Sequence, residues 1–259
     1  MPLSMTPRRE RWLLITLAGI QFTNILDFMI MMPLGPALTS LFRISDAQFG
    51  LLVSAYTLAG GASGLLASTY IDKFDRKRLL LVLYSLFALS TLACGIAPSY
   101  EALMVARVFA GLFGGVLSAL SQTIVGDVIP FERRGRAMGV VMTSFSVSTV
   151  AGVPLGLFLA AQFGWHMPFL LIAAICVLFA VFAFLTLPAL NSHLQGHADA
   201  SAWGRISEVL QDRNHLKAFS FSALLMFSGF TVIPYITIFM QTNVGLRADQ
   251  VPSVYLCGG

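Results

Sequence analysis

The hydrophobic residues of the chain fall into long, nearly uncharged runs that are separated by short polar connections. About 20 apolar residues cross the hydrocarbon core of a bilayer as a helix, so each run is long enough to span a membrane. The pattern predicts transmembrane helices at residues 12–36, 47–71, 79–97, 101–125, 137–161, 167–188 and 216–240, and an eighth that begins near Pro252. The runs are continuous rather than alternating, which disfavours a transmembrane barrel.

The composition agrees with a protein that is embedded in a membrane. Hydrophobic residues make up 57% of the chain and charged residues 11%, whereas a soluble domain carries about 25% charged residues. The mean hydropathy is +0.80. The net charge of +4 does not indicate nucleic-acid binding, because the basic residues lie in short connections, where they orient the helices. The expected partner is therefore a lipid bilayer and not a nucleic acid.

The distribution of Lys and Arg predicts that the N-terminus lies in the cytoplasm. Of the 16 Lys and Arg residues, all except Arg43, Arg107 and Arg247 lie in the N-terminal segment or in alternate connections. The positive-inside rule places such connections on the cytoplasmic side. Residues 1–11 lead into the first span without a small-residue cleavage site, so they are predicted to be a retained cytoplasmic tail rather than a signal peptide.

The longest polar connection divides the chain into unequal parts. Residues 12–188 are predicted to form a six-helix transmembrane bundle, residues 189–215 a cytoplasmic linker, and residues 216–259 a seventh helix with the start of an eighth. A helix that ended in mid-membrane would leave backbone carbonyls without partners, at several kcal/mol each. We therefore expect the chain to be part of a longer protein, with further helices beyond Gly259.

Two charged residues lie inside predicted spans. Asp27 is about 22 Å along the first helix from its cytoplasmic end, and Arg107 is about 10 Å from the outer end of the fourth. The two helices run in opposite directions, so the charges come to a similar depth. A lone charge there costs from about 3 kcal/mol to far more, and such residues usually pair or face a cavity. We expect Asp27 and Arg107 to interact, directly or through water, in a central cavity. The alternative is a permanent ion pair that only locks two helices together.

Further polar residues are spaced to share faces with these charges. Gln21, Asn24 and Met31 lie on the helical face of Asp27, whereas Gly111, Ser118 and Gln122 lie on that of Arg107. A mixture of polar, apolar and Met side chains suits an amphiphilic ligand, so Gln21, Asn24, Met31 and Gln122 are predicted to line the cavity. For Gln21 and Gln122, interhelical hydrogen bonding is an equally good interpretation. Small residues around Gly60 and Gly114 predict close helix packing.

The connection from Asp72 to Arg78 is almost entirely charged and predicts a tight turn at a membrane face. Asp127 ends the fourth span, where a carboxylate opposes the helix dipole. It is expected to have a basic partner in its own turn or in the turn before it, although a solvated charge at the headgroup level is the alternative. The candidate residues of the two turns are Asp72, Lys73, Arg76, Lys77, Asp127, Arg133, Arg134 and Arg136.

No pattern in the sequence indicates an enzyme, a metal or a cofactor. A phosphate-binding Gly-x-x-x-x-Gly-Lys-Ser/Thr loop is missing, so an ATP-driven pump is not supported. His193 and His197 are four residues apart in a polar connection without a third ligand. The three cysteines are scattered through apolar segments and have no metal or disulfide spacing.

Three motifs, in order along the chain, resemble the major facilitator superfamily, and more closely its drug:proton antiporter and sugar-efflux branch. Residues 68–78 resemble the signature between helices two and three, with Asp72 as the acid, Arg76-Lys77 as the basic run, and Ser68 and Asp75 where the pattern has glycine. Residues 103–111 are similar to the proton-coupling motif, whose arginine matches Arg107. The segment Gly152-Val153-Pro154-Leu155-Gly156 resembles the fifth-helix antiporter motif.

The resemblance implies an all-α membrane fold of twelve helices in two six-helix bundles, each built from inverted three-helix repeats around a midplane site. This chain would supply the first bundle, helix seven and the start of helix eight. The implied function is proton-coupled export of a small organic solute, drug-like or sugar-like, across the inner membrane. Asp27 would be the protonatable residue, Arg107 its counter-charge, and Asp72 with Arg76 and Lys77 a cytoplasmic latch. The alternative is a truncated, non-transporting remnant or interaction protein, because half of such a transporter cannot alternate.

Overall fold

The computed structural model describes residues 6–188, 190, 209, 211–232, 236–247, 250–251 and 253–254. In this part of the chain every regular element is helical, which confirms the predicted all-α class. The α-helices are α1 (Pro7–Ile30), α2 (Gly35–Phe42), α3 (Asp46–Tyr70), α4 (Arg76–Gly95), α5 (Tyr100–Val128), α6 (Phe131–Val147), α7 (Val153–Phe163), α8 (Met167–Thr186), α10 (Arg213–Val232) and α11 (Ile236–Thr242). A 3₁₀ turn, η1 (Ile71–Lys73), precedes α4, and a π-helical turn, η2 (Ser148–Gly152), precedes α7.

Six described helices are long and apolar enough to cross a membrane. They are Pro7–Ile30, Asp46–Lys73, Arg76–Gly95, Tyr100–Val128, Phe131–Phe163 and Met167–Thr186, which correspond to the first six predicted spans. The seventh predicted span, 216–240, covers most of α10 and α11, with residues 233–235 between them outside the described residues. Most of the predicted linker, including His193 and His197, lies outside the described residues, as does the residue at which the eighth span was predicted to begin.

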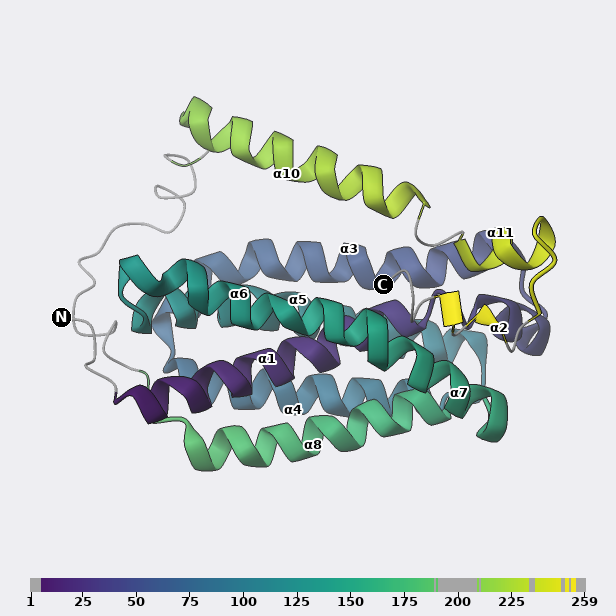
Figure 1. Cartoon of the computed structure of the whole chain (residues 1–259), viewed down its shortest axis with the longest axis horizontal. Coiled ribbons are helices and arrows are strands. Elements are labelled where there is room, and N and C mark those ends of the chain that lie inside the picture. Colours follow the sequence, from purple (N-terminus) through teal and green to yellow (C-terminus); the bar gives the residue numbers. More distant parts are fainter. Residues whose placement is uncertain are drawn as a thin grey trace.

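The six spanning helices lie side by side along the long axis of the molecule (Figure 1). Helix α5 packs on α3 and α4, α8 packs on α4 and α1, and α1 packs on α6. This arrangement places α1 and α5, which carry the two predicted buried charges, at the centre of the bundle. Helix α10 runs beside α3 on the outside (Figure 1), and most of its side chains are exposed.

Prolines and a π turn set two boundaries that differ from the sequence prediction. The first span was predicted to continue to residue 36, but α1 ends at Ile30 and a separate α2 begins at Gly35. Pro33 and Pro36 explain the break, because proline removes a backbone donor and clashes with the preceding turn. Helix α1 also begins earlier than the predicted span, at Pro7 rather than at residue 12. In the fifth span, η2 lies just before Pro154 and joins α6 to α7.

Glycines bring the backbones of α3 and α5 into direct contact. A Cβ atom added to Gly115 would lie 2.1 Å from the carbonyl oxygen of Gly60, and one added to Gly111 would lie 2.3 Å from that of Tyr56. Small residues at spacing three and four allow such approaches between membrane helices. The close contact matters for the site because it presses the middle of α3, which carries Tyr56, onto α5, which carries Arg107.

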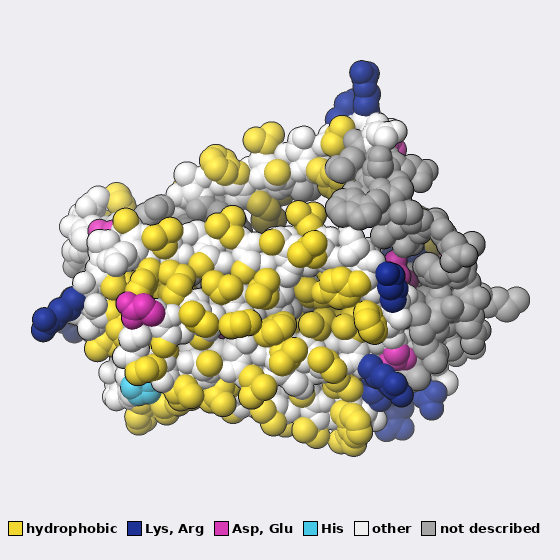
Figure 2. Space-filling model, turned by 180° about the vertical axis from the view of Figure 1, so that it is seen from behind, with side chains coloured by type: hydrophobic (Ala, Val, Ile, Leu, Met, Phe, Trp, Pro, Cys, Tyr) yellow, Lys and Arg dark blue, Asp and Glu magenta, His cyan; other side chains and the backbone are white. Residues whose placement is uncertain are grey.

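The surface has the character expected of a membrane protein. Hydrophobic side chains cover the length of the bundle in Figure 2, whereas Lys and Arg side chains gather mainly towards one end. Apolar residues on the outside include Leu58 and Leu65, which are 72% and 77% exposed. A soluble monomer rarely exposes a contiguous apolar surface of this extent. The pattern therefore matches helices that face lipid.

Adding one methyl group at the contact between α3 and α5 is expected to destabilise the bundle. Gly115→Ala should lower the free energy of unfolding by about 1–3 kcal/mol, because overpacking forces the backbones apart. Gly61→Ala on α3 is the matched control, since a Cβ atom there meets nothing within 4 Å. The measurement is thermal unfolding of the detergent-solubilised protein. Equal melting temperatures for the two variants would show that the contact is not as tight as described.

Candidate functional site

Asp27 and Arg107 form a direct ion pair in the centre of the bundle. Arg107 Nη1 donates to Asp27 Oδ2 at 2.8 Å and to the Asp27 carbonyl oxygen at 3.1 Å. Both side chains are 0% exposed. The predicted contact between the first and fourth spans is therefore direct rather than mediated by water. The pair was also expected to lie in a central cavity; in this structure packed side chains enclose both charges, and neither residue lines the two cavities described below.

The pair leaves part of its hydrogen-bonding capacity unused. In the described part of the chain, Asp27 Oδ1 and Arg107 Nε and Nη2 are buried without a hydrogen-bond partner. Buried polar groups are normally satisfied, and exceptions of this kind concentrate at functional sites. Thr91 of α4 is a polar neighbour of the Asp27 carboxylate. Asp27 Oδ1 therefore has capacity left to accept a further donor or a proton.

Tyr56 of α3 covers the arginine. Its ring centroid lies 4.2 Å from Arg107 Cζ, which is the geometry of a cation–π interaction. Its hydroxyl donates a 2.8 Å hydrogen bond to Asn24 Oδ1 on α1, and its ring stacks on Phe28 with centroids 5.5 Å apart. Sequence reasoning missed Tyr56 because it carries no charge. The available signal was that a tyrosine inside an apolar span needs a hydrogen-bond partner when it is buried.

A small cavity lies next to Tyr56 and Asn24. It has a volume of about 260 Å³ and is formed by α1, α3 and α5. Its lining residues are Asn24, Ile25, Phe28, Tyr56, Thr57, Gly60, Gly114, Gly115 and Ser118. Asn24 Nδ2 donates to the Gly114 carbonyl oxygen at 3.0 Å and to Ser118 Oγ at 2.9 Å. The cavity is thus bounded by uncharged hydrogen-bonding groups and aromatic rings.

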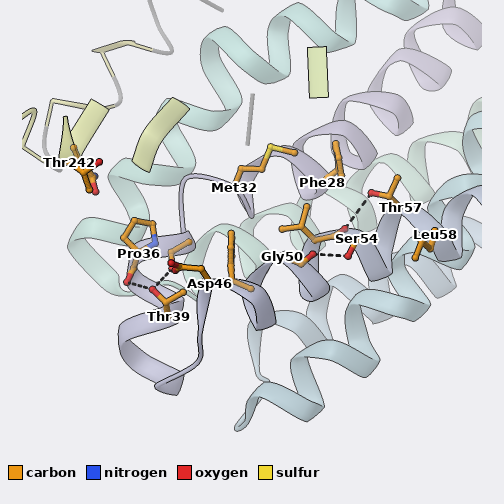
Figure 3. A pocket seen from close by; sticks show the side chains of 14 residues that line it. Phe28, Met32, Pro36, Thr39, Asp46, Gly50, Ser54, Thr57, Leu58 and Thr242 are labelled. Carbon is orange, nitrogen blue, oxygen red and sulfur yellow. Dashed lines mark hydrogen bonds between the residues drawn. The ribbon is translucent and has the colours of Figure 1, made fainter. Parts of the chain in front are cut away.

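A larger cavity of about 680 Å³ lies nearer the end of the bundle that carries α2, at the start of α3. Its lining comes from the end of α1, from α2, from the first half of α3 and from α11. In Figure 3, Pro36, Thr39 and Asp46 lie close together, and Gly50, Ser54 and Thr57 lie further along α3. Drug-sized ligand sites have volumes of about 300–1,000 Å³. Phe28 and Thr57 line both cavities.

The four residues predicted to line the cavity have different positions. Asn24 lines the smaller cavity. Gln21 is buried and its Oε1 lies 3.4 Å from Ser118 Oγ, so it supports the cavity wall from behind. Met31 is fully buried in the hydrophobic core, and Gln122 is exposed on α5. Asn24 thus reaches the smaller cavity, whereas Met31 and Gln122 line neither of the two cavities described here.

Arg76 is the centre of a second polar cluster, at the end of the bundle where η1 meets α4 and α5. It is 3% exposed and donates to the Ile71 carbonyl oxygen at 2.6 Å, to Asp72 Oδ1 at 2.7 Å and to Asp127 Oδ2 at 3.1 Å. The basic partner expected for Asp127 is therefore Arg76. This single guanidinium ties the turn between α3 and α4 to the end of α5.

The other basic residues of the charged turns make different contacts. Lys77 does not join the Arg76 cluster, because its Nζ donates to the carbonyl oxygens of Phe184 and Leu187 at the end of α8, where a cation complements the helix dipole. Arg133 pairs with Glu10 at 3.0 Å, and Arg134 donates to the Ile129 carbonyl oxygen at 3.0 Å. Lys73 and Arg136 are exposed.

Asp75 and the fifth-span glycines have structural reasons for their identities. Asp75 stands where the resembled motif has glycine, and its carboxylate caps α4 by accepting from the Arg78 backbone N–H at 2.8 Å. A Cβ atom on Gly152 would lie 2.8 Å from Leu26, and one on Gly156 would lie 2.6 Å from Ile30. The motif around Pro154 therefore packs closely against α1. Among the described residues, no group of three His, Cys, Asp or Glu side chains is placed to hold a metal ion.

Comparison with known proteins agrees with the membrane fold described above. The family model described as Major Facilitator Superfamily matches residues 17–259. The chain is similar to the uncharacterized MFS-type transporter YtbD of Bacillus subtilis, with 30% identity over 208 residues, which is 80% of this chain and 51% of that protein. It is also 28% identical over 200 residues to a probable sugar efflux transporter of Helicobacter acinonychis, covering 77% of this chain and 50% of that one.

Solved structures show the same fold. A bacterial homolog of the human lysosomal transporter Spinster, in an inward-facing and unoccupied conformation, aligns with a TM-score of 0.75 at 19% identity, over 98% of this chain and 60% of that one. A D-xylose-proton symporter aligns with a TM-score of 0.72 at 18% identity, over 97% and 66%. The chain thus spans about half the length of the curated relatives described above. The match of the family model to nearly the whole chain shows that the protein belongs to the major facilitator superfamily.

Proposed function

We propose that this chain is part of a proton-coupled secondary transporter that exports a small organic solute by alternating access. The observation that carries the proposal is the fully buried Asp27–Arg107 pair, in which one carboxylate oxygen has no hydrogen-bond partner among the described residues. Ionisable residues inside a membrane are rare and usually mark ion or substrate pathways. The cavity of uncharged polar and aromatic groups beside the pair offers a place for a solute.

The proposed coupling follows from the energetics of a buried pair. Breaking such a pair by removing one charge costs about 3–5 kcal/mol, because it leaves the other charge buried and uncompensated. Protonation of Asp27 removes the carboxylate charge and with it the attraction to Arg107. An energy of this size is ample to shift an equilibrium between two access states, for which about 1–3 kcal/mol of coupling is typical.

Export and substrate class are inferred from relatives and from the cavity. One relative is named a probable sugar efflux transporter, and one protein of the same fold is named a D-xylose-proton symporter. The smaller cavity is lined mainly by apolar surface, with a few amide and hydroxyl groups and aromatic rings, so both a sugar-like and a drug-like solute remain candidates. In the proposed setting the protein lies in the inner membrane with its N-terminus in the cytoplasm.

The cluster around Arg76 is proposed to act as a latch at the cytoplasmic face. Arg76 contacts η1 and the end of α5 at once, so it fixes the relative position of the turn and of the helix that carries Arg107. Asp72 and Asp127 are only partly buried, with 27% and 34% of their side chains exposed. Both acids can therefore reach further partners when the access state changes.

Asp27→Asn, made in the complete protein that contains this sequence, is expected to abolish coupling. Efflux of monosaccharides and lipophilic dyes from cells would be screened first, with and without a proton uncoupler. For any solute whose efflux the uncoupler slows, the variant should lose the uncoupler-sensitive part by at least about ten-fold, given the few kcal/mol at stake in a buried charge pair. Glu101→Gln, an exposed acid at the start of α5, is the control.

A second variant separates loss of coupling from loss of folding. Asp27→Asn leaves Arg107 buried without a counter-charge, which itself destabilises the protein. The double variant Asp27→Asn/Arg107→Gln removes both charges and should fold better than the single one. If this double variant reaches the membrane and still shows efflux that the uncoupler slows as in the parent, proton coupling through Asp27 is disproved.

Arg76→Lys should destabilise the protein although the charge is kept. Lysine cannot donate from three separate nitrogens in a planar fork, so buried acceptors lose their partners. The expected loss in free energy of unfolding is about 1–3 kcal/mol. Arg78→Lys, at an exposed position, should stay within about 0.5 kcal/mol of the parent. Thermal unfolding in detergent distinguishes the two variants. Equal melting temperatures for Arg76→Lys and Arg78→Lys would show that the three guanidinium hydrogen bonds of Arg76 do not stabilise the protein.

The proposed orientation can be tested with single cysteines. Pro98→Cys lies in the exposed turn between α4 and α5, and Gly135→Cys lies at an exposed position near the start of α6, where nothing crowds the new side chain. The basic residues near Gly135 should hold that end in the cytoplasm. A membrane-impermeant maleimide added to intact cells should label Pro98→Cys, and label Gly135→Cys only after permeabilisation. The reverse pattern would invert the topology.

A further inference from the structure

The side chain of Tyr56 contacts both the buried ion pair and the smaller cavity. Arg107 is 0% exposed and is not among the residues that line the 260 Å³ cavity, whereas Tyr56 lines that cavity. The Tyr56 ring also lies over the guanidinium, 4.2 Å from Arg107 Cζ to the ring centroid. Tyr56 therefore offers a direct contact path from the cavity to the pair.

The hydroxyl of Tyr56 is held by the polar wall of the cavity. It donates to Asn24 Oδ1 at 2.8 Å, and the amide nitrogen of the same asparagine donates to Ser118 Oγ at 2.9 Å. Helix α5 leaves room for this contact, because a Cβ atom on Gly114 would lie 2.6 Å from Asn24 Oδ1 and 2.8 Å from the Tyr56 hydroxyl. A continuous set of contacts thus runs from Ser118 through Asn24 and Tyr56 to Arg107.

We propose that Tyr56 is a positioning residue that couples the cavity between α1, α3 and α5 to the buried Asp27–Arg107 pair. Its ring holds the guanidinium against Asp27, and its hydroxyl holds Asn24 in the cavity wall. The inference rests on the proposed proton-coupled function and adds the residue through which the two parts of the site communicate. Tyr56 is not proposed to carry a proton.

The coupling works in both directions because each contact of Tyr56 depends on the other. When Asp27 is protonated, Arg107 loses its counter-charge and is free to shift beneath the ring. A shift of the ring moves the hydroxyl and weakens its bond to Asn24, which alters the cavity wall. Conversely, a group in the cavity that occupies Asn24 Oδ1 displaces the hydroxyl and loosens the ring over Arg107. Such reciprocity is required of any two linked binding equilibria.

In the described part of the chain, four titratable side chains interact electrostatically with the carboxylate or its partner. They are Arg107 on α5, Tyr56 on α3, Cys94 on α4 and Cys176 on α8. Arg107 remains charged at all accessible pH values. Tyrosine and cysteine ordinarily titrate well above neutrality. A change in the cavity between acidic and neutral pH that disappears in the Asp27→Asn variant is therefore assigned to Asp27.

The test needs no knowledge of the transported solute. Thr57→Cys places a thiol on the cavity wall at an exposed position beside Tyr56. Its rate of labelling by N-ethylmaleimide is measured between acidic and neutral pH in the complete detergent-solubilised protein, with Cys257→Ser to remove a background site. Cys94 and Cys176 are buried. The reactivity of the introduced thiol itself changes with pH. Each labelling rate is therefore divided by the rate measured at the same pH in a protein that also carries Asp27→Asn. Should Asp27→Asn not fold, Asp27→Asn/Arg107→Gln provides the reference.

The normalised rate is expected to change with pH by roughly two- to ten-fold, the range that one net hydrogen bond can shift an equilibrium. Tyr56→Phe removes only the hydroxyl and keeps the ring over Arg107, and it should flatten this dependence. Tyr84→Phe is the matched control. Tyr84 is fully buried and its hydroxyl lies 2.9 Å from Thr23 Oγ1 of α1, but it does not line the cavity. It should keep the parent's dependence.

The outcomes separate this inference from the proposed function. If the parent's normalised rate depends on pH and Tyr56→Phe leaves that dependence intact, the role of Tyr56 is refuted while proton sensing by Asp27 stands. If Tyr84→Phe flattens the dependence as much as Tyr56→Phe does, the effect is a general loss of packing and the inference is also refuted. A parent rate that does not change with pH relative to the Asp27→Asn reference overturns both.

Discussion

The ion pair between Asp27 and Arg107 is the constraint on which the rest of the bundle depends. Two charges that are 0% exposed have lost their hydration, and only a close, well-aligned contact returns part of that cost. The contact requires α1 and α5 to lie next to each other at the centre, with their other faces covered by apolar neighbours. The glycine contact between α3 and α5 supplies one part of that cover, because it brings Tyr56 onto the guanidinium.

The two polar clusters of the bundle differ in what they can do. The Asp27–Arg107 pair is enclosed and has few alternatives, so any change in its charge must be answered by movement of neighbouring helices. The cluster around Arg76 lies at the end of the bundle, and both of its acids are partly exposed. A partly solvated cluster exchanges partners at much lower cost than a buried pair. This contrast suits the proposed function, in which a proton binds in the interior and contacts rearrange at the face.

Sequence reasoning succeeded where the cost of exposing or burying a group dominated. The six spans follow from the length of apolar runs, and the pairing of Asp27 with Arg107 follows from the expense of a lone charge in lipid. It failed where helix rotation decided the result. Met31 shares the face of Asp27 by spacing, yet it is buried in the core, and Gln122 is exposed on α5. Lys77 stands next to Arg76 in the chain but caps α8 instead.

The sequence by itself determined the helical class, the spans, the basic end and the two charges that must meet. These features depend on local composition and on the free energy of transferring each residue between water and lipid. Both can be evaluated one residue at a time. Only the tertiary structure decided that Tyr56 lies over Arg107, that Arg76 binds Asp127 and that the pair itself is closed to solvent. Those outcomes depend on the crossing and rotation of three helices at once. A one-dimensional pattern with the period of a single helix does not contain that information.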